Sequence, residues 1–391
     1  MSEVKKNILA VILLIASAFT GTLAFRLAVP AIAYYSRDVL KASMVSISVI
    51  STSFIFARAF AAVLGGYVVD KRPRLIFLGA LAMALNAPLV YLYSLATSWM
   101  EIVGIKLANG FLNGISWPLA QLAVAYASPK NIRARISAIY FFAGSLASLT
   151  GNYLYAFTSN LGIKGQMVIS GLFYVSTGFL MLFAYLLIGS VKKVSGDKKS
   201  ELEIDPKIIL GLGALFSFLS AFAFGEVTYV YISESLDMSK EKTAVLLGTV
   251  SFLSSLTSYL LSWIADSMGT TQALRLISVL AGLSPFFASI KVLPTIIIGI
   301  FLALVSVNSF RPISRKVLVS HSRSSLAIGG INGIQNISTF IGGIIFGLAY
   351  SLGSFSILHL AFLPYYPLAI LSLIMVKEIR KFTKITSGGE R

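Results

Sequence analysis

Several charged side chains stand inside long apolar stretches of this sequence, among them Arg26, Arg58, Lys106 and Glu226. Placing such a group at the centre of a bilayer costs about 2.5–3.5 kcal/mol on insertion scales, so these residues are functional candidates. Arg58 precedes Asp70 by 12 residues, which places it roughly 18 Å along a helix, near the middle of an apolar layer about 30 Å thick. We expect Arg58 to bind an anionic group of a solute or a partner carboxylate. The alternative is a structural arginine that is bonded to backbone carbonyls or asparagine.

Two further charges allow alternative interpretations. Glu226 is the only carboxylate well inside an apolar stretch, which makes it the candidate for a coupling proton, because alternating burial changes the proton affinity of a carboxylate. The alternative is a solvated carboxylate at the outer rim. Lys106 lies about 10 Å from one edge of its stretch and can either snorkel to the interface or add positive charge to a cavity.

Amide and aromatic side chains recur where a cavity is expected. In one stretch they are spaced by four residues and share a helix face, at Asn109, Asn113, Trp117 and Gln121. A later stretch contains Asn332, Gln335 and Asn336. Buried amides must be hydrogen-bonded, so they face protein or a wet cavity rather than lipid. Asn113, Trp117 and the three later amides are therefore candidates for contact with a solute, and the alternative is that they join helices together.

The composition is that of a membrane protein with several spans. Of 391 residues, 57% are hydrophobic and 12% are charged, whereas a soluble domain is about 25% charged. The mean hydropathy is +0.85. These values disfavour a soluble enzyme, a nucleic-acid-binding protein and a disordered chain. The chain has no cysteine, which excludes disulfides and thiolate metal sites.

Twelve stretches are long enough to cross a bilayer, which takes roughly 20 mainly apolar residues. We predict spans at Ile8–Tyr34, Met44–Val69, Arg74–Ala96, Trp99–Ala127, Arg135–Thr158, Gly165–Ser190, Ile208–Ile232, Thr243–Asp266, Gln272–Ile290, Leu293–Val319, Ser325–Tyr350 and Phe355–Lys377. If the N-terminus is cytoplasmic, 22 of the 32 Lys and Arg residues fall in inner segments and six in outer ones. This asymmetry predicts a multi-pass protein of the cell membrane with both termini in the cytoplasm.

The spans divide into two related halves. The longest polar stretch, 191–207, separates a bundle at 1–190 from a bundle at 208–391 that ends in a short cytoplasmic tail. Three features repeat at similar offsets: Asp70 and Asp266 are 196 positions apart, Ala147 and Ser338 are 191 apart, and Pro118 and Pro312 are 194 apart. Parallel six-helix repeats of this kind place a site at their interface near the midplane.

The loop after the second span carries the most specific pattern, Gly-Tyr-Val-Val-Asp-Lys-Arg-Pro-Arg at 66–74. The sequence resembles the major facilitator superfamily of secondary transporters, whose pattern there is Gly-x-Leu-Ala-Asp-Arg-x-Gly-Arg-Arg/Lys. Gly66, Asp70, Lys71 and Arg74 are in register with it, while Pro73 replaces the second glycine. Looser matches follow in the fourth span, at Lys106, Gly110 and Gly114, and in the fifth, where Gly151 alone is kept of the family's Gly-Pro-x-x-Gly-Gly.

This resemblance implies an all-α membrane protein with twelve transmembrane helices in two pseudo-symmetric six-helix bundles that rock around a central site. It implies a conformational latch formed by Gly66, Asp70, Lys71, Arg74 and Asp266. It also implies that the first helices of the two halves face each other, so that Arg26 and Glu226 form part of an outer gate. Arg26 is then also a candidate for binding the solute.

Other classes of function lack their residues. There is no phosphate-binding loop, no metal-ligand spacing around the two histidines and no pair of carboxylates inside the membrane, so we expect no cofactor, no metal and no enzyme activity. The sequence predicts an alternating-access transporter for a small anionic or zwitterionic organic solute, with possible proton coupling, that works as a monomer in the lipid bilayer. The alternatives are an exporter of hydrophobic or cationic compounds, a non-transporting receptor or lipid scramblase, and a membrane enzyme.

Overall fold

A computed structural model describes residues 3–129, 133–188, 206–321 and 325–387 of the chain. Within these ranges it does not describe the side chains of residues 66, 68–71, 73, 133–135, 206, 262–268, 315–321, 325–329 and 380–387. Nine stretches of the described residues are long and apolar enough to cross a membrane. The predicted all-α membrane fold is confirmed, because helices make up most of each of the twelve predicted spans.

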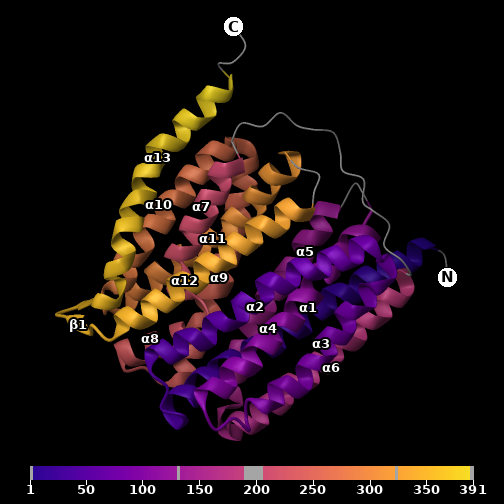
Figure 1. Ribbon diagram of the computed structural model, residues 1–391, viewed down its shortest axis with the longest axis horizontal. Coiled ribbons are helices and arrows are strands. Elements are labelled where there is room, and N and C mark those ends of the chain that lie inside the picture. Colours follow the sequence, from indigo (N-terminus) through magenta and orange to yellow (C-terminus); the bar gives the residue numbers. More distant parts are fainter. Residues whose placement is uncertain (1–2, 130–132, 189–205, 322–324, 388–391) are drawn as a thin grey trace. The chain divides into compact units, whose positions relative to one another are not determined.

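The chain divides into two compact units, and unit 1 comprises Met1–Ala42, Ser53–Ser195 and Ser239–Thr249. Its core is made by α1, which packs against α5 and α6, and by α3, which packs against α4 and α6. The helices of this part of the sequence, drawn in indigo to magenta in Figure 1, are α1 (Glu3–Tyr34), the π-helix η1 (Tyr35–Val39), α2 (Met44–Lys71), η2 (Pro73–Ile76), α3 (Phe77–Leu92), α4 (Trp99–Ala127), α5 (Arg133–Phe157), η3 (Ser159–Leu161) and α6 (Gly162–Ile188).

Unit 2 comprises Ser43–Thr52, Gly196–Met238 and Val250–Arg391. In it, α10 packs against α11 and α13, and α7 packs against α12. The elements of this part of the sequence are α7 (Pro206–Leu219), η4 (Ala221–Ala223), α8 (Glu226–Leu236), α9 (Lys240–Met268), α10 (Thr270–Ser289), α11 (Leu293–His321), α12 (Ser325–Tyr350), β1 (Ser354–Phe355), β2 (Leu358–His359), η5 (Leu360–Tyr365) and α13 (Tyr366–Ser387).

Each unit includes the beginning of one helix from the other half of the sequence. The first part of α2 belongs to unit 2, and the first part of α9 belongs to unit 1. The two exchanged segments begin at Ser43 and Ser239, 196 residues apart, which is the offset between Asp70 and Asp266. The exchange therefore involves equivalent parts of the two sequence repeats.

Two predicted spans differ from the structure. The seventh is not one helix, because α7 ends at Leu219, η4 follows, and α8 begins at Glu226. The chain turns there through Gly225 at a φ of 72°, a left-handed conformation that glycine adopts without steric cost. The last span was predicted to start at Phe355, but that residue lies in an antiparallel β1–β2 hairpin, and α13 starts only at Tyr366.

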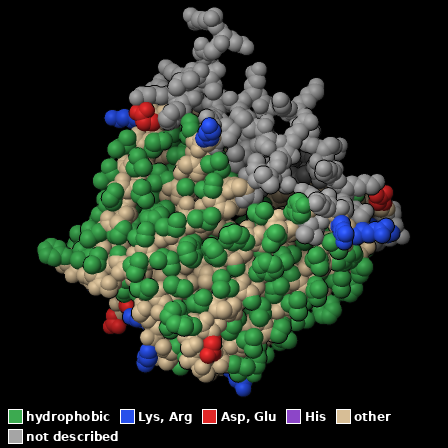
Figure 2. All heavy atoms as spheres, in the orientation of Figure 1, with side chains coloured by type: hydrophobic (Ala, Val, Ile, Leu, Met, Phe, Trp, Pro, Cys, Tyr) green, Lys and Arg blue, Asp and Glu red, His purple; other side chains and the backbone are tan. Residues whose placement is uncertain are grey.

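Hydrophobic side chains cover most of the described surface that Figure 2 shows, and the charged side chains lie toward its margins. This distribution is the one expected of helices whose outward faces contact lipid. The start of α4 shows how a helix begins at such a margin. The Ser98 hydroxyl accepts a hydrogen bond from the Glu101 N–H, and the Glu101 carboxylate accepts one from the Thr97 N–H, a reciprocal cap that satisfies backbone donors.

Candidate functional site

Glycines on α4 bring α2 into close contact in unit 1. A Cβ at Gly110 would collide with the carbonyl oxygen of Phe54, and one at Gly114 would lie 2.6 Å from the Cβ of Ala61 and the carbonyl oxygen of Arg58. Small residues that let backbones approach are typical of packed membrane helices. The four-residue spacing of Lys106, Gly110 and Gly114 puts all three on one face of α4. The contact thus fixes Phe54 and Arg58 of α2 beside α4.

Lys106 is enclosed by aromatic rings instead of reaching the interface. Only 2% of the residue is exposed. Its Nζ atom lies 5.6 Å from the ring centre of Phe25 and 5.7 Å from those of Phe54 and Tyr93. Cations within about 6 Å of a ring face are attracted by its quadrupole, and more strongly where water is excluded. The snorkelling interpretation of Lys106 is therefore wrong, and its charge stays inside unit 1.

Arg58 is exposed, and it lies across α2 from a stripe of apolar side chains. Phe56, Phe60 and Val63 form an exposed apolar stripe on this helix. Successive helical residues are rotated by about 100°, so Arg58 is roughly 140–160° around the helix from that stripe. The Arg58 side chain is nevertheless exposed. Arg58 is thus an exposed cation on the face of α2 opposite the apolar stripe.

A network of amides joins α3, α4 and the Trp117 indole. The Asn86 Oδ1 atom accepts hydrogen bonds from Asn109 Nδ2 at 2.6 Å and from Asn113 Nδ2 at 3.0 Å. Trp117 Nε1 donates to Asn113 Oδ1 at 2.9 Å, and the Cη2 atom of Trp117 would lie 2.9 Å from a Cβ on Gly21 of α1. Asn113 uses both ends of its amide within the protein. The structure thus places Asn113 and Trp117 in a network that joins helices.

Arg26 lies on α1 where α5 comes close. A Cβ at Gly151 would stand 2.8 Å from the Cβ of Arg26 and 3.0 Å from the carbonyl oxygen of Leu23. Gly151 is the residue of the fifth-span pattern that this sequence keeps, and its role here is to admit the α1 backbone beside α5. Arg26 is half-buried.

The break in the seventh span positions Glu226 in unit 2. Glu226 is the first residue of α8, and only 1% of it is exposed. It is the one carboxylate that is fully buried among the residues whose side chains are described. The next backbone N–H, that of Val227, donates to the Ser51 hydroxyl at 3.1 Å, so the exchanged segment of α2 caps the start of α8.

The candidate amides of unit 2 lie on α12. Gln335 is buried next to α7, with its Cγ atom 3.6 Å from the position of a Cβ on Gly213. Its Nε2 atom has no hydrogen-bond partner within the described residues. Asn332 and Asn336 flank it on the same helix and are half-buried. An unpaired buried amide donor costs free energy, so Gln335 is suited to donating to a ligand or to water.

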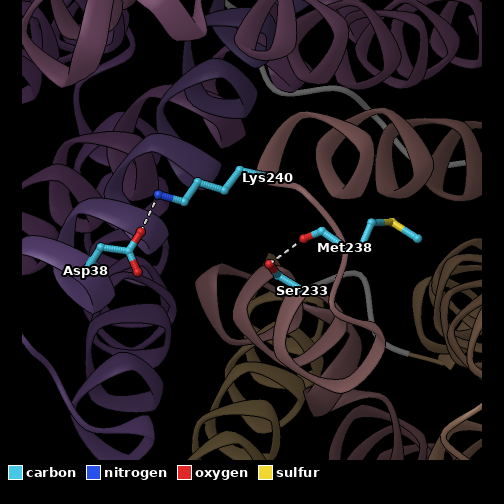
Figure 3. Close-up of polar contacts among 4 residues, drawn as sticks. All are labelled: Asp38, Ser233, Met238 and Lys240. Atoms are coloured by element: carbon cyan, nitrogen blue, oxygen red, sulfur yellow. Dashed lines mark hydrogen bonds and ion pairs between the residues drawn. The ribbon is translucent and has the colours of Figure 1, made fainter.

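The connector between α8 and α9 passes from unit 2 to unit 1, and polar contacts hold it within each unit. In unit 2, the Ser233 hydroxyl donates to the carbonyl oxygen of Met238 at 2.8 Å. In unit 1, Lys240 forms an ion pair with Asp38 of η1 (Figure 3). The Lys240 Nζ atom also lies 5.5 Å from the ring centre of Tyr34. These charged side chains are about half-exposed, which makes the ion pair weak and reversible.

Comparison with known proteins now decides the family. The family model described as Major Facilitator Superfamily matches residues 14–307, more than half of the chain. The chain belongs to the major facilitator superfamily. No curated protein sequence matches it.

Solved structures of major facilitator transporters share the fold at low identity. A structure of the nucleoside transporter NupG is 15% identical at a TM-score of 0.72 and covers 95% of this chain and 99% of its own. A POT family transporter in complex with 5-aminolevulinic acid is 12% identical at 0.74, covering 96% of each chain. A D-xylose-proton symporter is 14% identical at 0.68, covering 95% of this chain and 97% of its own. These likenesses concern the fold.

The latch predicted from the major facilitator pattern lies mostly outside the described side chains. Gly66, Asp70 and Lys71 stand in the last turns of α2 and Asp266 near the end of α9, and none of these four side chains is described. Arg74 is described and is exposed in η2. The latch therefore stays a prediction.

Sequence reasoning missed the residues that complete the polar and aromatic surroundings of α4. Asn86 was detectable as an amide in the otherwise apolar third span. Phe25, Phe54 and Tyr93 come from three different helices or their ends, and no sequence spacing relates them to Lys106. Only the helix packing brings these rings around one cation.

Proposed function

We propose that this chain is a secondary active transporter that moves a small anionic or zwitterionic organic solute by alternating access. Its family supports transport of a small molecule. The preference for anionic groups rests on one observation: Arg58 is exposed on the face of α2 opposite the apolar stripe. A guanidinium offers paired donors that match a carboxylate or phosphate in two-point geometry.

We assign the other contacts to the solute from the exposure and the hydrogen bonding of each side chain. Arg26 is half-buried and adds a second cation from α1. Gln335 offers an amide donor from α12, flanked by Asn332 and Asn336. Asn113 and Trp117 hold the helices of the site together and do not contact the solute, because their polar atoms already bond within the protein. Lys106 contributes long-range positive potential from its enclosure among three rings.

Alternating access requires contacts that can separate. Candidates are those made by the exchanged segments: a Cβ on Gly347 of α12 would lie 2.7 Å from the Ser48 Cβ in unit 2, and Tyr153 bonds Thr249 at 3.3 Å in unit 1. The Asp38–Lys240 ion pair belongs to the same set. All are small-residue or hydroxyl contacts, or half-exposed charges, which rearrange at low cost.

Proton coupling is the second part of the proposal and rests on Glu226. A buried carboxylate at the start of a broken helix can be exposed or covered by a small change in backbone position. Half-helices of this kind are common ion and substrate sites in transporters. The gate between Arg26 and Glu226 stays a prediction.

A thermal-shift screen tests the charge preference. Purified protein is heated with matched anionic, zwitterionic and cationic metabolites, and Arg58→Ala and Arg58→Lys are measured beside it. The control is Arg311→Ala, which removes another exposed arginine, on α11. A ligand at a hundredfold its Kd stabilises the folded state by about 2.7 kcal/mol. We expect an anionic or zwitterionic compound to stabilise the natural protein and Arg311→Ala, but not Arg58→Ala. Stabilisation by hydrophobic cations alone, unchanged in Arg58→Ala, would instead identify an exporter of such compounds.

A further inference from the structure

The connector between α12 and α13 is an apolar β-hairpin that projects from unit 2. Ser354 pairs with His359 and Phe355 with Leu358, and the two residues between the strands make the turn. Figure 1 shows the hairpin, labelled β1, beyond the adjoining ends of α12 and α13. In Figure 2 the same corner is covered by hydrophobic side chains.

The side chains on this hairpin are large, apolar and uncovered. Phe355 is 73% exposed, and Leu352, Ile357 and Leu358 are exposed as well. Residues 325–376 contain no Asp, Glu, Lys or Arg. The connector between α8 and α9, by contrast, carries Asp237 and is followed at once by Lys240, and the one between α1 and α2 carries Arg37 and Lys41. A connector that stands in water has no reason to present four large apolar side chains and no charge.

Backbone and ring contacts hold the hairpin against the rest of unit 2. The Lys291 N–H donates to the carbonyl oxygen of Ile357 at 2.7 Å, and Ile290 bridges Leu358, which pairs the hairpin with the α10–α11 connector. At its base His359 is buried and lies 4.6 Å from Tyr350, centre to centre. The contacts with Lys291 and Ile290 pair part of the hairpin backbone, which lowers the cost of placing it at an apolar layer.

Exposed apolar side chains are also present on the helices that adjoin the hairpin. Leu348 on α12 and Leu363, Ile370 and Ile374 after the hairpin are exposed, and in a membrane-spanning pair these side chains face lipid. Val292 and Leu293, beside the hairpin on the α10–α11 connector, are exposed too. The surface of the hairpin is therefore expected to contact lipid, as the adjoining helices do.

We propose that the hairpin formed by Ser354–His359 inserts its apolar side chains into the lipid bilayer, at the boundary between headgroups and acyl chains, and anchors unit 2 to one leaflet. Aromatic and aliphatic side chains around a polar backbone are favoured at this boundary. The alternative occupant is a second copy of the chain, which would pair with the hairpin or cover Phe355.

The natural absence of cysteine makes the test direct, because any introduced thiol is the only one. Phe355→Cys and Ile357→Cys are labelled with a nitroxide, and the protein is reconstituted into vesicles of phosphatidylcholine and phosphatidylglycerol. Leu371→Cys, on the exposed face of α13, gives the lipid reference, and Lys164→Cys, at the exposed start of α6, gives the water reference. Collisions with oxygen report apolar surroundings, and collisions with a neutral nickel chelate report water. Thermal unfolding of each labelled variant confirms that it is folded.

We expect the labels at 355 and 357 to show the high oxygen and low nickel accessibility of position 371. Nickel accessibility equal to that at 164 would overturn the proposal. Spin–spin broadening at 355 that disappears on dilution with unlabelled protein would assign the surface to a second copy and overturn it as well. The readout is independent of transport, so failure of the proposed function leaves this result unaffected.

Discussion

Gly110 is the residue on which the close contact of α2 and α4 depends most. A Cβ at this position would meet the Phe54 carbonyl oxygen closer than real Cβ contacts allow, and would lie 3.0 Å from the Phe54 C and Cα atoms. Gly104 lies on the same helix, and a Cβ there would meet nothing within 4 Å. We predict that Gly110→Ala destabilises the protein and weakens solute binding, whereas Gly104→Ala does neither.

The size of the effect follows from two opposing contributions. Replacing glycine by alanine inside a helix gains about 1 kcal/mol at either position through the lower conformational entropy of the unfolded chain. At Gly110 the overpacked contact costs about 1–3 kcal/mol or more, because the obstacle is backbone and cannot rotate away as a side chain does. We therefore expect Gly104→Ala to be neutral or stabilising and Gly110→Ala to be less stable than it by about 1–3 kcal/mol.

Intrinsic tryptophan fluorescence during heating measures both variants, because Trp117 lies on α4. A difference of 1 kcal/mol shifts Tm by about 2–4 °C in a domain of 150–250 residues. Equal Tm values for Gly104→Ala and Gly110→Ala, with equal binding, would refute the inference that α2 and α4 touch at Gly110. A loss of stability with unchanged solute binding would show that the α2–α4 contact stabilises the fold but does not shape the solute site.

Three further outcomes are expected. His359 lies between the last two spans, and its burial lowers its pKa from 6.5 to about 4, with a further lowering by Lys291 and an opposing effect of Glu234. Between these two pH values the unfolded state binds more protons than the folded state, so thermal stability should fall as pH drops from about 6.5 to about 4 and level off below. His359→Gln should flatten this slope. Asn86→Ala removes the acceptor of two amides and should cost about 1–3 kcal/mol of unfolding free energy for each buried donor left unpaired, whereas Asn160→Ala, which is exposed, should be neutral in the same unfolding assay. Glu226→Gln should retain solute binding but abolish the stimulation of uptake into vesicles by an imposed pH gradient, and an unchanged pH response would remove Glu226 from the coupling step.

The sequence predicts the fold well because membrane solvation imposes a local rule. Apolar runs of the required length must become helices, and the predicted Trp99–Ala127 coincides with α4 residue for residue. The break in the seventh span was missed because the residues that precede Gly225, 221–224, are themselves apolar. A hydroxyl from the distant α2, that of Ser51, caps the helix that restarts there, and no local pattern encodes that contact.

Some features of the candidate site can likewise be predicted from the sequence, and others cannot. Depth along a helix can be counted from the sequence, so Arg58 and Glu226 could be selected without a structure. The residues that surround a side chain cannot be found by counting along the sequence. Lys106 stands close enough to an edge to snorkel, yet rings from α1, α2 and the end of α3 enclose it. That enclosure depends on how closely α2 approaches α4, which is a tertiary property.

Solute flux tests the central claim most directly. The compound that stabilises the purified protein is offered, radiolabelled, to proteoliposomes that contain the natural chain, Arg58→Lys, Arg58→Ala or the control Arg311→Ala. Saturable uptake by the natural chain and by Arg311→Ala, with at least a tenfold loss in Arg58→Ala, corresponding to about 1.4 kcal/mol, is the predicted result. Equal saturable uptake with and without the Arg58 guanidinium, or no saturable uptake by the natural chain, would contradict the account.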